Sequence, residues 1–372
     1  MNNNYKLNKT TLIEGKIESG KTTGIIFNEF KKMIDNNENI LVIDSKEEYY
    51  HQFKNELDNK DYETIVLNLK DVTKSNNYNP YTLPSYYYKN NNLDASIELI
   101  EKISKSIFFE DNSNGDPFWP QSASDLFVGL SLILIKEIKE EKYINMGELS
   151  ILYDLVHKKY EDSNLIKMYL SNLNTLDPIY TSLSGTMYAP ADTKGSILSV
   201  SKPKIKEYTL RSNLLSLLSS TNFDLINLGQ KKTAIFVIPN DDIVEYNNIA
   251  NIFIEQIIYL IKDKKLEFNL LFDNIDYIKH IDSLYSLLNL PSDNLKVMIA
   301  TRNLESLKEK YPKDTFSNVL TNIKIIDNKC IINNEEYNLN LVEKHNNDVK
   351  YPVTENTFQV FDIEKHLVDL LK

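Results

Sequence analysis

Apolar runs separated by helical patterns organise both ends of the chain. Runs of four to nine residues, typical of strands buried on both faces, occur at 40–44, 63–69, 231–239, 268–273, 296–301 and 323–326. A shorter β-prone run at 10–13 precedes residues 24–34, whose apolar positions recur at spacings of three and four, as in a half-buried helix. Strands that alternate with helices need crossover connections, so the pattern predicts an α/β fold with a mostly parallel sheet.

The middle of the chain has a different pattern. From residue 93 to 221 the apolar positions follow helical spacing, with helices expected near 97–108, 126–142, 149–159 and 165–173. Two turn-rich polar segments, 76–81 and 84–92, precede this region and favour a domain boundary there. We therefore expect a discontinuous nucleotide-binding domain, residues 1–92 and 222–372, with an all-α domain, residues 93–221, inserted in it.

The strongest local motif follows the first β-prone run. Residues 15–22 read GKIESGKT and match the phosphate-binding loop G-x-x-x-x-G-K-[ST]. Such a loop wraps a polyphosphate in backbone N–H groups, while its lysine neutralises β- and γ-phosphate oxygens and its last hydroxyl binds Mg²⁺. The alternative is a chance match in a chain rich in lysine and threonine. The candidate nucleotide-binding residues are Gly15, Lys16, Ile17, Glu18, Ser19, Gly20, Lys21, Thr22 and Thr23.

A phosphate-loop ATPase also needs a carboxylate at the end of a neighbouring strand to hold Mg²⁺. Asp273 ends the apolar run 268–273 and is our candidate, together with Thr22, for the metal site. The alternative is an aspartate that caps a turn. Asp44 ends the run 40–44 and is a weaker candidate, for which we favour a structural role.

Hydrolysis requires a group that orients or deprotonates the attacking water. Asn274, the residue after Asp273, can orient water but cannot accept its proton, so either Asp276 serves as the base or turnover is slow. Arg302, at the end of the run 296–301, is a candidate sensor of the γ-phosphate, and the alternative is a solvent-facing salt bridge. The expected catalytic set is therefore Lys21, Asp273, Asn274 and Arg302.

Composition narrows the possible partners and location. The net charge of −11 excludes a general electrostatic footprint for nucleic acid, so any DNA contact must use a local basic surface. Residues 202–206, KPKIK, form a basic run that reads as a loop, and a solvated charged face is the alternative to a DNA contact. One cysteine, Cys330, excludes an internal disulfide framework, and the chain starts without a signal-peptide pattern. We expect a cytoplasmic protein.

Several short segments, taken in their order along the chain, resemble those of the type IV coupling proteins, the TraG/TraD-like ATPases of conjugation and type IV secretion. The resemblance spans roughly residues 10–325, and no single segment beyond the phosphate loop is specific. The similar segments are residues 15–22, 42–48, 78–80, 116–119, 189–197, 233–239, Asp241 and Asp242, Asp273, and 300–304.

The resemblance implies a RecA-like motor with an inserted all-α domain, ATP and Mg²⁺ as cofactors, and assembly into a homo-hexamer. It also implies DNA, a relaxase and secretion-channel proteins as partners, with the all-α domain recruiting substrate. This chain departs from the family pattern at Asn274, where an acidic residue is usual, and at Ile17 and Glu18, where small residues are usual. The motor strand also begins within ten residues of Met1, where most members have membrane-spanning helices. We therefore expect membrane association only through a partner, peripheral at the inner face of the cell membrane.

Three hypotheses follow. The first is a coupling-protein-like ATPase that delivers a DNA–relaxase substrate to a secretion channel. The second is a non-hydrolysing recruitment or scaffold protein of the same system, which Asn274 favours. The third is a RecA-like DNA pump unrelated to secretion.

Overall fold

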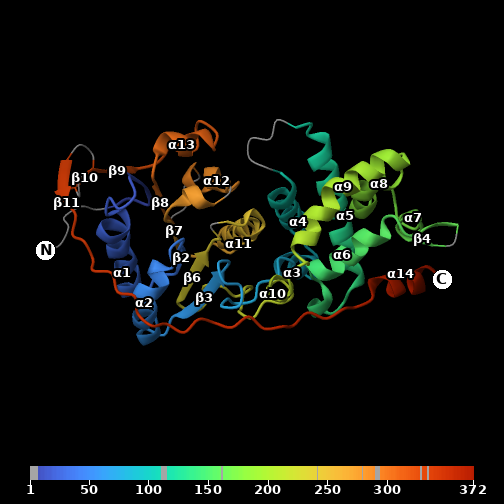
Figure 1. The fold of residues 1–372 in the computed structure, drawn as a ribbon, viewed down its shortest axis with the longest axis horizontal. Coiled ribbons are helices and arrows are strands. Elements are labelled where there is room, and N and C mark those ends of the chain that lie inside the picture. Colours follow the sequence, from blue (N-terminus) through green and yellow to red (C-terminus); the bar gives the residue numbers. More distant parts are fainter. Residues whose placement is uncertain are drawn as a thin grey trace. The chain divides into compact units, whose positions relative to one another are not determined.

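The computed structural model describes residues 7–109, 115–160, 162–240, 242–278, 280–289, 294–326, 329–332 and 335–372. The chain divides into two compact units, seen in Figure 1. The sheet unit comprises Met1–Ser75 and Ile226–Pro352, and the helical unit comprises Asn76–Leu225 and Val353–Lys372. Residues 76–92 and the last twenty residues thus lie in the helical unit, whereas the sequence pattern placed both in the nucleotide-binding domain. Asp241, one of the residues of the family resemblance, lies outside the described residues.

The sheet unit is built on nine strands in the order β11-β10-β9-β1-β8-β7-β2-β6-β3. The seven strands from β9 to β3 pair in parallel, and β10 and β11 add an antiparallel edge. All seven predicted strand regions are present, with ends that differ by up to two residues from those expected. The strands are β1 (Thr10–Gly15), β2 (Ile40–Ile43), β3 (Glu63–Asn68), β6 (Thr233–Ile238), β7 (Phe268–Phe272), β8 (Leu295–Thr301), β9 (Thr321–Ile326), β10 (Lys329–Ile332) and β11 (Glu335–Asn338).

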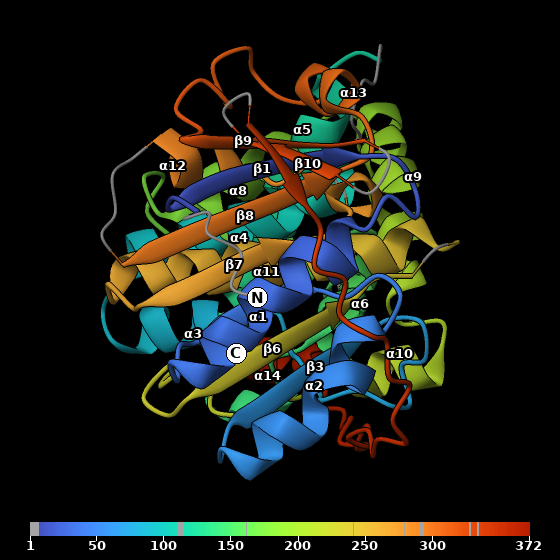
Figure 2. The same ribbon diagram turned by 90° about the vertical axis from the view of Figure 1, so that its left-hand side faces the viewer.

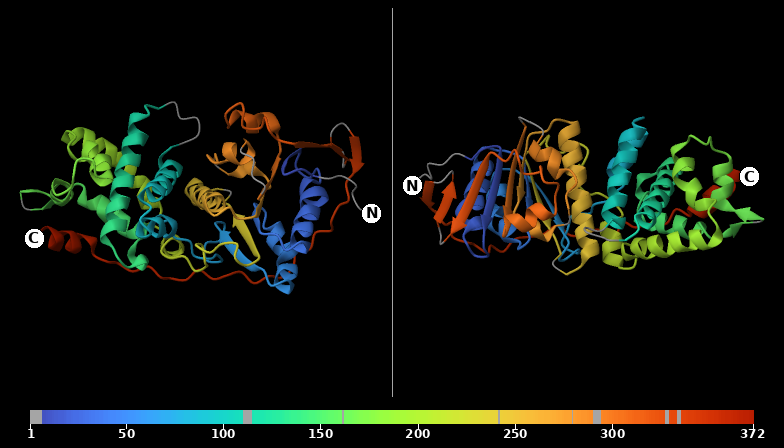
Figure 3. Two further views of the ribbon diagram at one scale, coloured as in Figure 1. Left: turned by 180° about the vertical axis from the view of Figure 1, so that it is seen from behind. Right: turned by 90° about the horizontal axis from the view of Figure 1, so that it is seen from above.

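Helices cover both faces of this sheet. Figures 2 and 3 show α1 (Phe27–Asp35) and α2 (Glu48–Asn59) on one face and α11 (Val244–Asp263) on the other. An aromatic cluster packs α1 and α2 together, with the rings of Phe30 and Phe53 4.8 Å apart and Tyr50 5.2 Å from Phe236 of β6. Shorter elements complete the unit: the wide helical segment η1 (Lys21–Ile26), η3 (Ile275–Tyr277), α12 (Leu284–Asn289) and α13 (Leu304–Glu309).

The helical unit is mostly helical, as its sequence pattern predicts. Its helices are α3 (Thr82–Lys89), α4 (Leu93–Phe108), α5 (Phe118–Glu137), η2 (Glu141–Tyr143), α6 (Met146–Leu155), α7 (Leu165–Ser171), α8 (Pro178–Met187), α9 (Ala191–Glu207), α10 (Ser212–Leu217) and α14 (Ile363–Leu371). A two-residue hairpin, β4 (Lys159–Tyr160) and β5 (Ser163–Asn164), interrupts them.

Two expectations for this unit were wrong. Residues 84–92 are not all turn, because α3 forms there and buries Leu83 and Tyr87; Pro84 lies in its first turn, where a missing N–H costs little. The basic run 202–206 is not a loop but the last turns of α9, with Pro203 inside the helix. One of its lysines, Lys202, already pairs with Asp154 at 2.5 Å.

One helix among the described residues, α5, is long and apolar enough to cross a membrane. Two thirds of its most apolar stretch, 67%, is buried inside the protein. That burial is expected of a helix in the core of a folded unit.

Candidate functional site

The phosphate loop connects β1 to η1, as its sequence predicts. Two residues of the loop take left-handed backbone angles, Gly20 with φ 88° and Glu18 with φ 60°. Gly15 has a steric reason to be glycine, since a Cβ there would lie 2.5 Å from Ser19 Oγ. The loop closes on itself, with the Ser19 N–H donating to the Lys16 carbonyl at 3.2 Å. The chain therefore forms a tight cradle ahead of a helix start.

Lys21 lies inside this cradle. Its ammonium donates to the carbonyls of Gly15 and, at 2.9 Å, of Lys16, and only 6% of the residue is exposed. Burial lowers the pKa of Lys21, and the nearby carboxylates of Asp273 and Asp276 oppose that shift. The lysine is thus held by main-chain oxygens at the position where a bound phosphate would take over its N–H groups.

Asp273 follows β7 directly and faces Thr22. The Thr22 hydroxyl and the Tyr49 hydroxyl both donate to Asp273 Oδ2, each at 2.8 Å. The other carboxylate oxygen, Oδ1, is buried and has no hydrogen-bond partner among the described residues. Burial raises the pKa of Asp273, and the two hydroxyls lower it. A threonine hydroxyl beside a carboxylate with an unpaired buried oxygen fits the donor set of a Mg²⁺ site.

Parallel register explains why these distant residues meet. Ile13 of β1 pairs with Ala300 of β8, and Ile299 of β8 pairs with Phe272 of β7. The carboxyl ends of parallel strands lie at one edge of a sheet, where α/β folds bind their ligands. The residues that follow these strands, Asp273 and Arg302 among them, therefore gather beside the phosphate loop.

Asn274 and Asp276 have different surroundings. Asn274 has left-handed backbone angles, φ 56° and ψ 53°, a conformation that asparagine adopts more readily than glutamate. Asp276 accepts the Thr301 hydroxyl at 2.9 Å and the Arg302 N–H at 3.0 Å, one on each carboxylate oxygen. Asp276 thus holds the end of β8 in place, which counts against the alternative that it acts as the base.

A cavity of about 320 Å³ collects most of the expected residues. Gly15 and Lys16 do not line it but bind Lys21 through their carbonyls, and Asp273 contacts it through Thr22. Four further lining residues were not among the expected site residues. Lys46 and Glu48 belong to segment 42–48 of the family resemblance, whereas no motif gives a signal for Leu341 and Lys344. The lining residues are Ile17, Glu18, Ser19, Gly20, Lys21, Thr22, Thr23, Lys46, Glu48, Asn274, Arg302, Leu341 and Lys344.

Asp44 follows the neighbouring strand β2, but its carboxylate accepts a hydrogen bond from the backbone of α2. Its Oδ2 accepts the Tyr50 N–H at 2.9 Å, and the residue is 1% exposed. Burial raises the pKa of Asp44 to about 7, although backbone N–H groups lower it. These contacts agree with the structural role favoured for Asp44.

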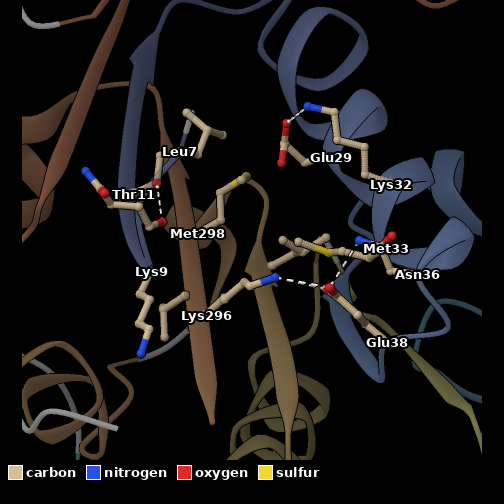
Figure 4. A pocket seen from close by; sticks show the side chains of 13 residues that line it. Leu7, Lys9, Thr11, Glu29, Lys32, Met33, Asn36, Glu38, Lys296 and Met298 are labelled. Atoms are coloured by element: carbon tan, nitrogen blue, oxygen red, sulfur yellow. Dashed lines mark hydrogen bonds and ion pairs between the residues drawn. The ribbon is translucent and has the colours of Figure 1, made fainter. Parts of the chain in front are cut away.

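A second pocket, of about 130 Å³, lies at the amino ends of the strands and is shown in Figure 4. Two of its three lysines form ion pairs that Figure 4 shows: Lys296 with Glu38 at 3.2 Å and Lys32 with Glu29 at 2.6 Å. Met33 and Met298 give it an apolar floor. None of the expected site residues lines it, and its described lining residues do not form a loop that offers backbone N–H groups to a phosphate.

Comparison with known proteins supports the same picture. The family of type IV secretory system conjugative DNA transfer proteins matches residues 11–344. Among solved structures, the chain is similar to the bacterial conjugative coupling protein TrwBdeltaN70 with sulphate (TM-score 0.63, 11% identity, 93% of this chain and 88% of that chain). It is similar also to the plasmid coupling protein TrwB with ADP and Mg²⁺ (TM-score 0.64, 11% identity, 93% and 88%) and with the ATP analogue ADPNP (TM-score 0.63, 11% identity, 93% and 88%). No functionally curated protein matches the chain. At this identity the solved structures show the fold alone, and they confirm the RecA-like α/β fold class.

Proposed function

Because the chain belongs to the family of type IV secretory system conjugative DNA transfer proteins, we propose that it binds ATP with Mg²⁺ and helps deliver a DNA–relaxase substrate to a secretion channel. The nucleotide would lie on residues 15–23, with Thr22 and Asp273 holding the metal. The observation that carries this proposal is the Thr22–Asp273 hydrogen bond at 2.8 Å, next to the Lys21 ammonium that the Gly15 and Lys16 carbonyls hold. The TrwB structures with ADP and Mg²⁺ and with ADPNP support the choice of ligand.

Nucleotide binding is tested by Lys21→Ala. Removing the ammonium takes away charge-assisted hydrogen bonds to phosphate, worth about 1.5–3 kcal/mol each, so ATP affinity falls by roughly tenfold to a hundredfold or more. Lys16→Ala is the matched control, because it removes the same charge from the same loop while the Lys16 carbonyl still holds Lys21. Fluorescence titration with a labelled ATP measures both variants. Equal affinities for ATP in the two variants would contradict the proposal.

The second candidate function is recruitment without hydrolysis. Asn274 cannot accept a proton, and both oxygens of Asp276 are engaged with Thr301 and Arg302. These two observations favour an ATP-binding protein with slow turnover or none. In that case the nucleotide orders the sheet unit, and the helical unit binds the relaxase or channel proteins.

ATP turnover with and without single-stranded DNA separates the two functions. A motor hydrolyses ATP faster when DNA is present, and a recruitment protein does not. Asn274→Glu raises the rate if a carboxylate is all that is missing, at a cost of about 1 kcal/mol for placing glutamate in the left-handed region. Asn274→Asp is the control, since aspartate tolerates that region better and carries the same charge. A rate that stays at background in every variant rules out the motor.

The assembly and location belong to the same proposal. We place the protein in the cytoplasm, attached to the inner face of the membrane only through a partner, and we propose a homo-hexamer as its working form. Light scattering of the purified chain with saturating ATP and Mg²⁺ tests the hexamer. A chain that stays monomeric with nucleotide and DNA bound contradicts it.

A further inference from the structure

The chain between β11 and the helical unit lies against the phosphate-loop helix. We call residues 339–351 the strap; Figures 1 and 2 show it as the red segment that passes α1 and α2. The Val342 N–H donates to the Thr23 carbonyl at 2.9 Å, and the Asn28 side chain donates to the Asn340 carbonyl at 2.9 Å. Leu339 packs on Gly24, where an added Cβ would lie 3.0 Å from its side chain.

The second half of the strap is fixed on α2 and the turn before it. The His345 N–H donates to Gln52 Oε1 at 2.7 Å, and the Asn347 side chain donates to the His51 carbonyl at 2.9 Å. Tyr351 donates to Glu47 Oε2 at 2.6 Å. The strap is therefore an ordered part of the sheet unit, held at both ends by hydrogen bonds.

Two side chains of the strap line the cavity of about 320 Å³ that holds the phosphate loop. Leu341 is 53% exposed, although a leucine gains by burial, and it lines the cavity one residue before the strap bonds to Thr23. Lys344 lines the same cavity and pairs with Glu48 at 2.8 Å. An exposed apolar side chain and a lysine of the strap thus line the same cavity as the phosphate loop.

The two ends of the cavity have different chemistry. Lys21, Thr22 and the adjoining Asp273 provide the cation, hydroxyl and carboxylate that a terminal phosphate and its metal need. The first half of the strap, with Leu341, lies instead at Thr23 and Gly24, further along the helix. Lys344 pairs with Glu48, whose charge acts on Asp273, so it lies nearer the carboxylate side of the cavity. A triphosphate whose terminal phosphates lie at Lys21 extends its ribose and base away from Thr22 and Asp273, where an apolar side chain can pack against them.

We propose that the strap completes the nucleotide site: Leu341 packs against the nucleobase or ribose, and Lys344 exchanges its contact with Glu48 for the phosphate chain. This inference rests on the proposed binding of ATP to the phosphate loop. It assigns two binding residues about 320 positions beyond the loop, in a stretch without motif or regular secondary structure.

Comparing ATP with inorganic tripolyphosphate, which has no base or sugar, tests each side chain separately. Leu341→Ser weakens ATP binding about five- to tenfold, from the lost apolar contact, and leaves tripolyphosphate binding unchanged. Lys344→Met weakens both ligands by about the same factor, and Lys344→Arg restores them. Lys350→Met is the control, because Lys350 is an exposed strap lysine that contacts Tyr50 through its carbonyl.

The outcomes are distinct. Wild-type protein that binds ATP while Leu341→Ser and Lys344→Met bind it equally well overturns the strap assignment and leaves the phosphate-loop proposal standing. An equal loss of ATP and tripolyphosphate binding in Leu341→Ser also overturns the assignment of Leu341 to the base. Wild-type protein that binds neither ligand overturns the strap and the proposed function together. The melting temperature of each variant is measured alongside, and exposed side chains are expected to leave it unchanged.

Discussion

Replacing Tyr49 by phenylalanine removes one hydroxyl from a buried aromatic cluster and leaves the ring. The residue is 2% exposed, and its ring lies 4.9 Å from Phe27 and 5.5 Å from Phe30. The hydroxyl donates to Asp273 Oδ2 at 2.8 Å. Tyr49→Phe therefore keeps the packing and takes one of two hydroxyl donors from a buried carboxylate.

The expected loss of stability depends on whether the acceptor of the hydrogen bond is charged. A hydrogen bond to a charged group contributes about 1.5–3 kcal/mol, and one between neutral groups about 0.5–1.5 kcal/mol. The neighbouring Tyr50 donates to a neutral acceptor, the Lys350 carbonyl, also at 2.8 Å. We expect Tyr49→Phe to lower the free energy of unfolding by about 2 kcal/mol and Tyr50→Phe by about 1 kcal/mol.

The pH dependence of that difference is a further check. Burial raises the pKa of Asp273 in the folded state, and the hydrogen bond from the Tyr49 hydroxyl opposes that rise. Losing the hydroxyl therefore costs most when Asp273 is ionised, and the cost falls as the pH drops through that pKa and the carboxyl is protonated. The stability lost in Tyr50→Phe does not depend on the protonation of Asp273.

The assay must report on the sheet unit. Trp119 is the single tryptophan and lies at the start of α5 in the helical unit, so tryptophan fluorescence is the wrong probe. Urea-dependent hydrogen exchange of peptides that cover β7 measures the opening free energy where Asp273 is attached. The reasoning is refuted if Tyr49→Phe costs no more than Tyr50→Phe at pH 7.5.

Three further predictions concern stability. Burial raises the pKa of Asp44 from 3.8 to about 7, so between these values the folded state keeps a proton that the unfolded state releases, and stability falls as the pH rises. Thermal melts should therefore show a smaller loss of stability between pH 5 and pH 8 in Asp44→Asn than in the wild-type protein. Gly24→Ala forces Leu339 aside and costs about 1–2 kcal/mol in urea unfolding, whereas Gly195→Ala, where a Cβ meets nothing within 4 Å, gains about 0.5–1 kcal/mol. Asn145→Ala removes the side chain that caps α6 and costs about 1 kcal/mol, seen in the urea midpoint of the helical unit by tryptophan fluorescence.

The sheet and the nearness of Asp273 to the phosphate loop were predictable because each leaves a local signal. Apolar runs marked the parallel strands, and a loop pattern with fixed spacing marked residues 15–22. The position of Asp273 could be predicted because the carboxyl ends of parallel strands lie at one edge of a sheet. The register of β7 and β8 brings Asp273 to the edge where β1 ends. Its distance from Thr22 in the sequence, 251 residues, does not matter once the strands are parallel.

Other features depend on the fold as a whole. Nothing in the order Asp273, Asn274, Asp276 says that Asn274 takes a left-handed conformation, after which Asp276 accepts from Thr301 and the Arg302 N–H. Pro203 made the basic run look like a loop, yet the surrounding helix absorbs it within α9. In both places tertiary contacts decide the local conformation, and single-sequence patterns do not record them.

The charge of the site shows how misleading a whole-chain property is for a local surface. With a net charge of −11, the chain as a whole repels anions such as ATP. The cavity reverses that sign, because four cationic side chains and two carboxylates line it. Two of the cations, Lys46 and Lys344, come from segments without a phosphate-binding motif. Lys344 forms an ion pair with Glu48. Folding therefore concentrates positive charge at the edge of the sheet where the phosphate loop lies. Lys344 of the strap, for which the sequence contains no motif, provides part of that charge.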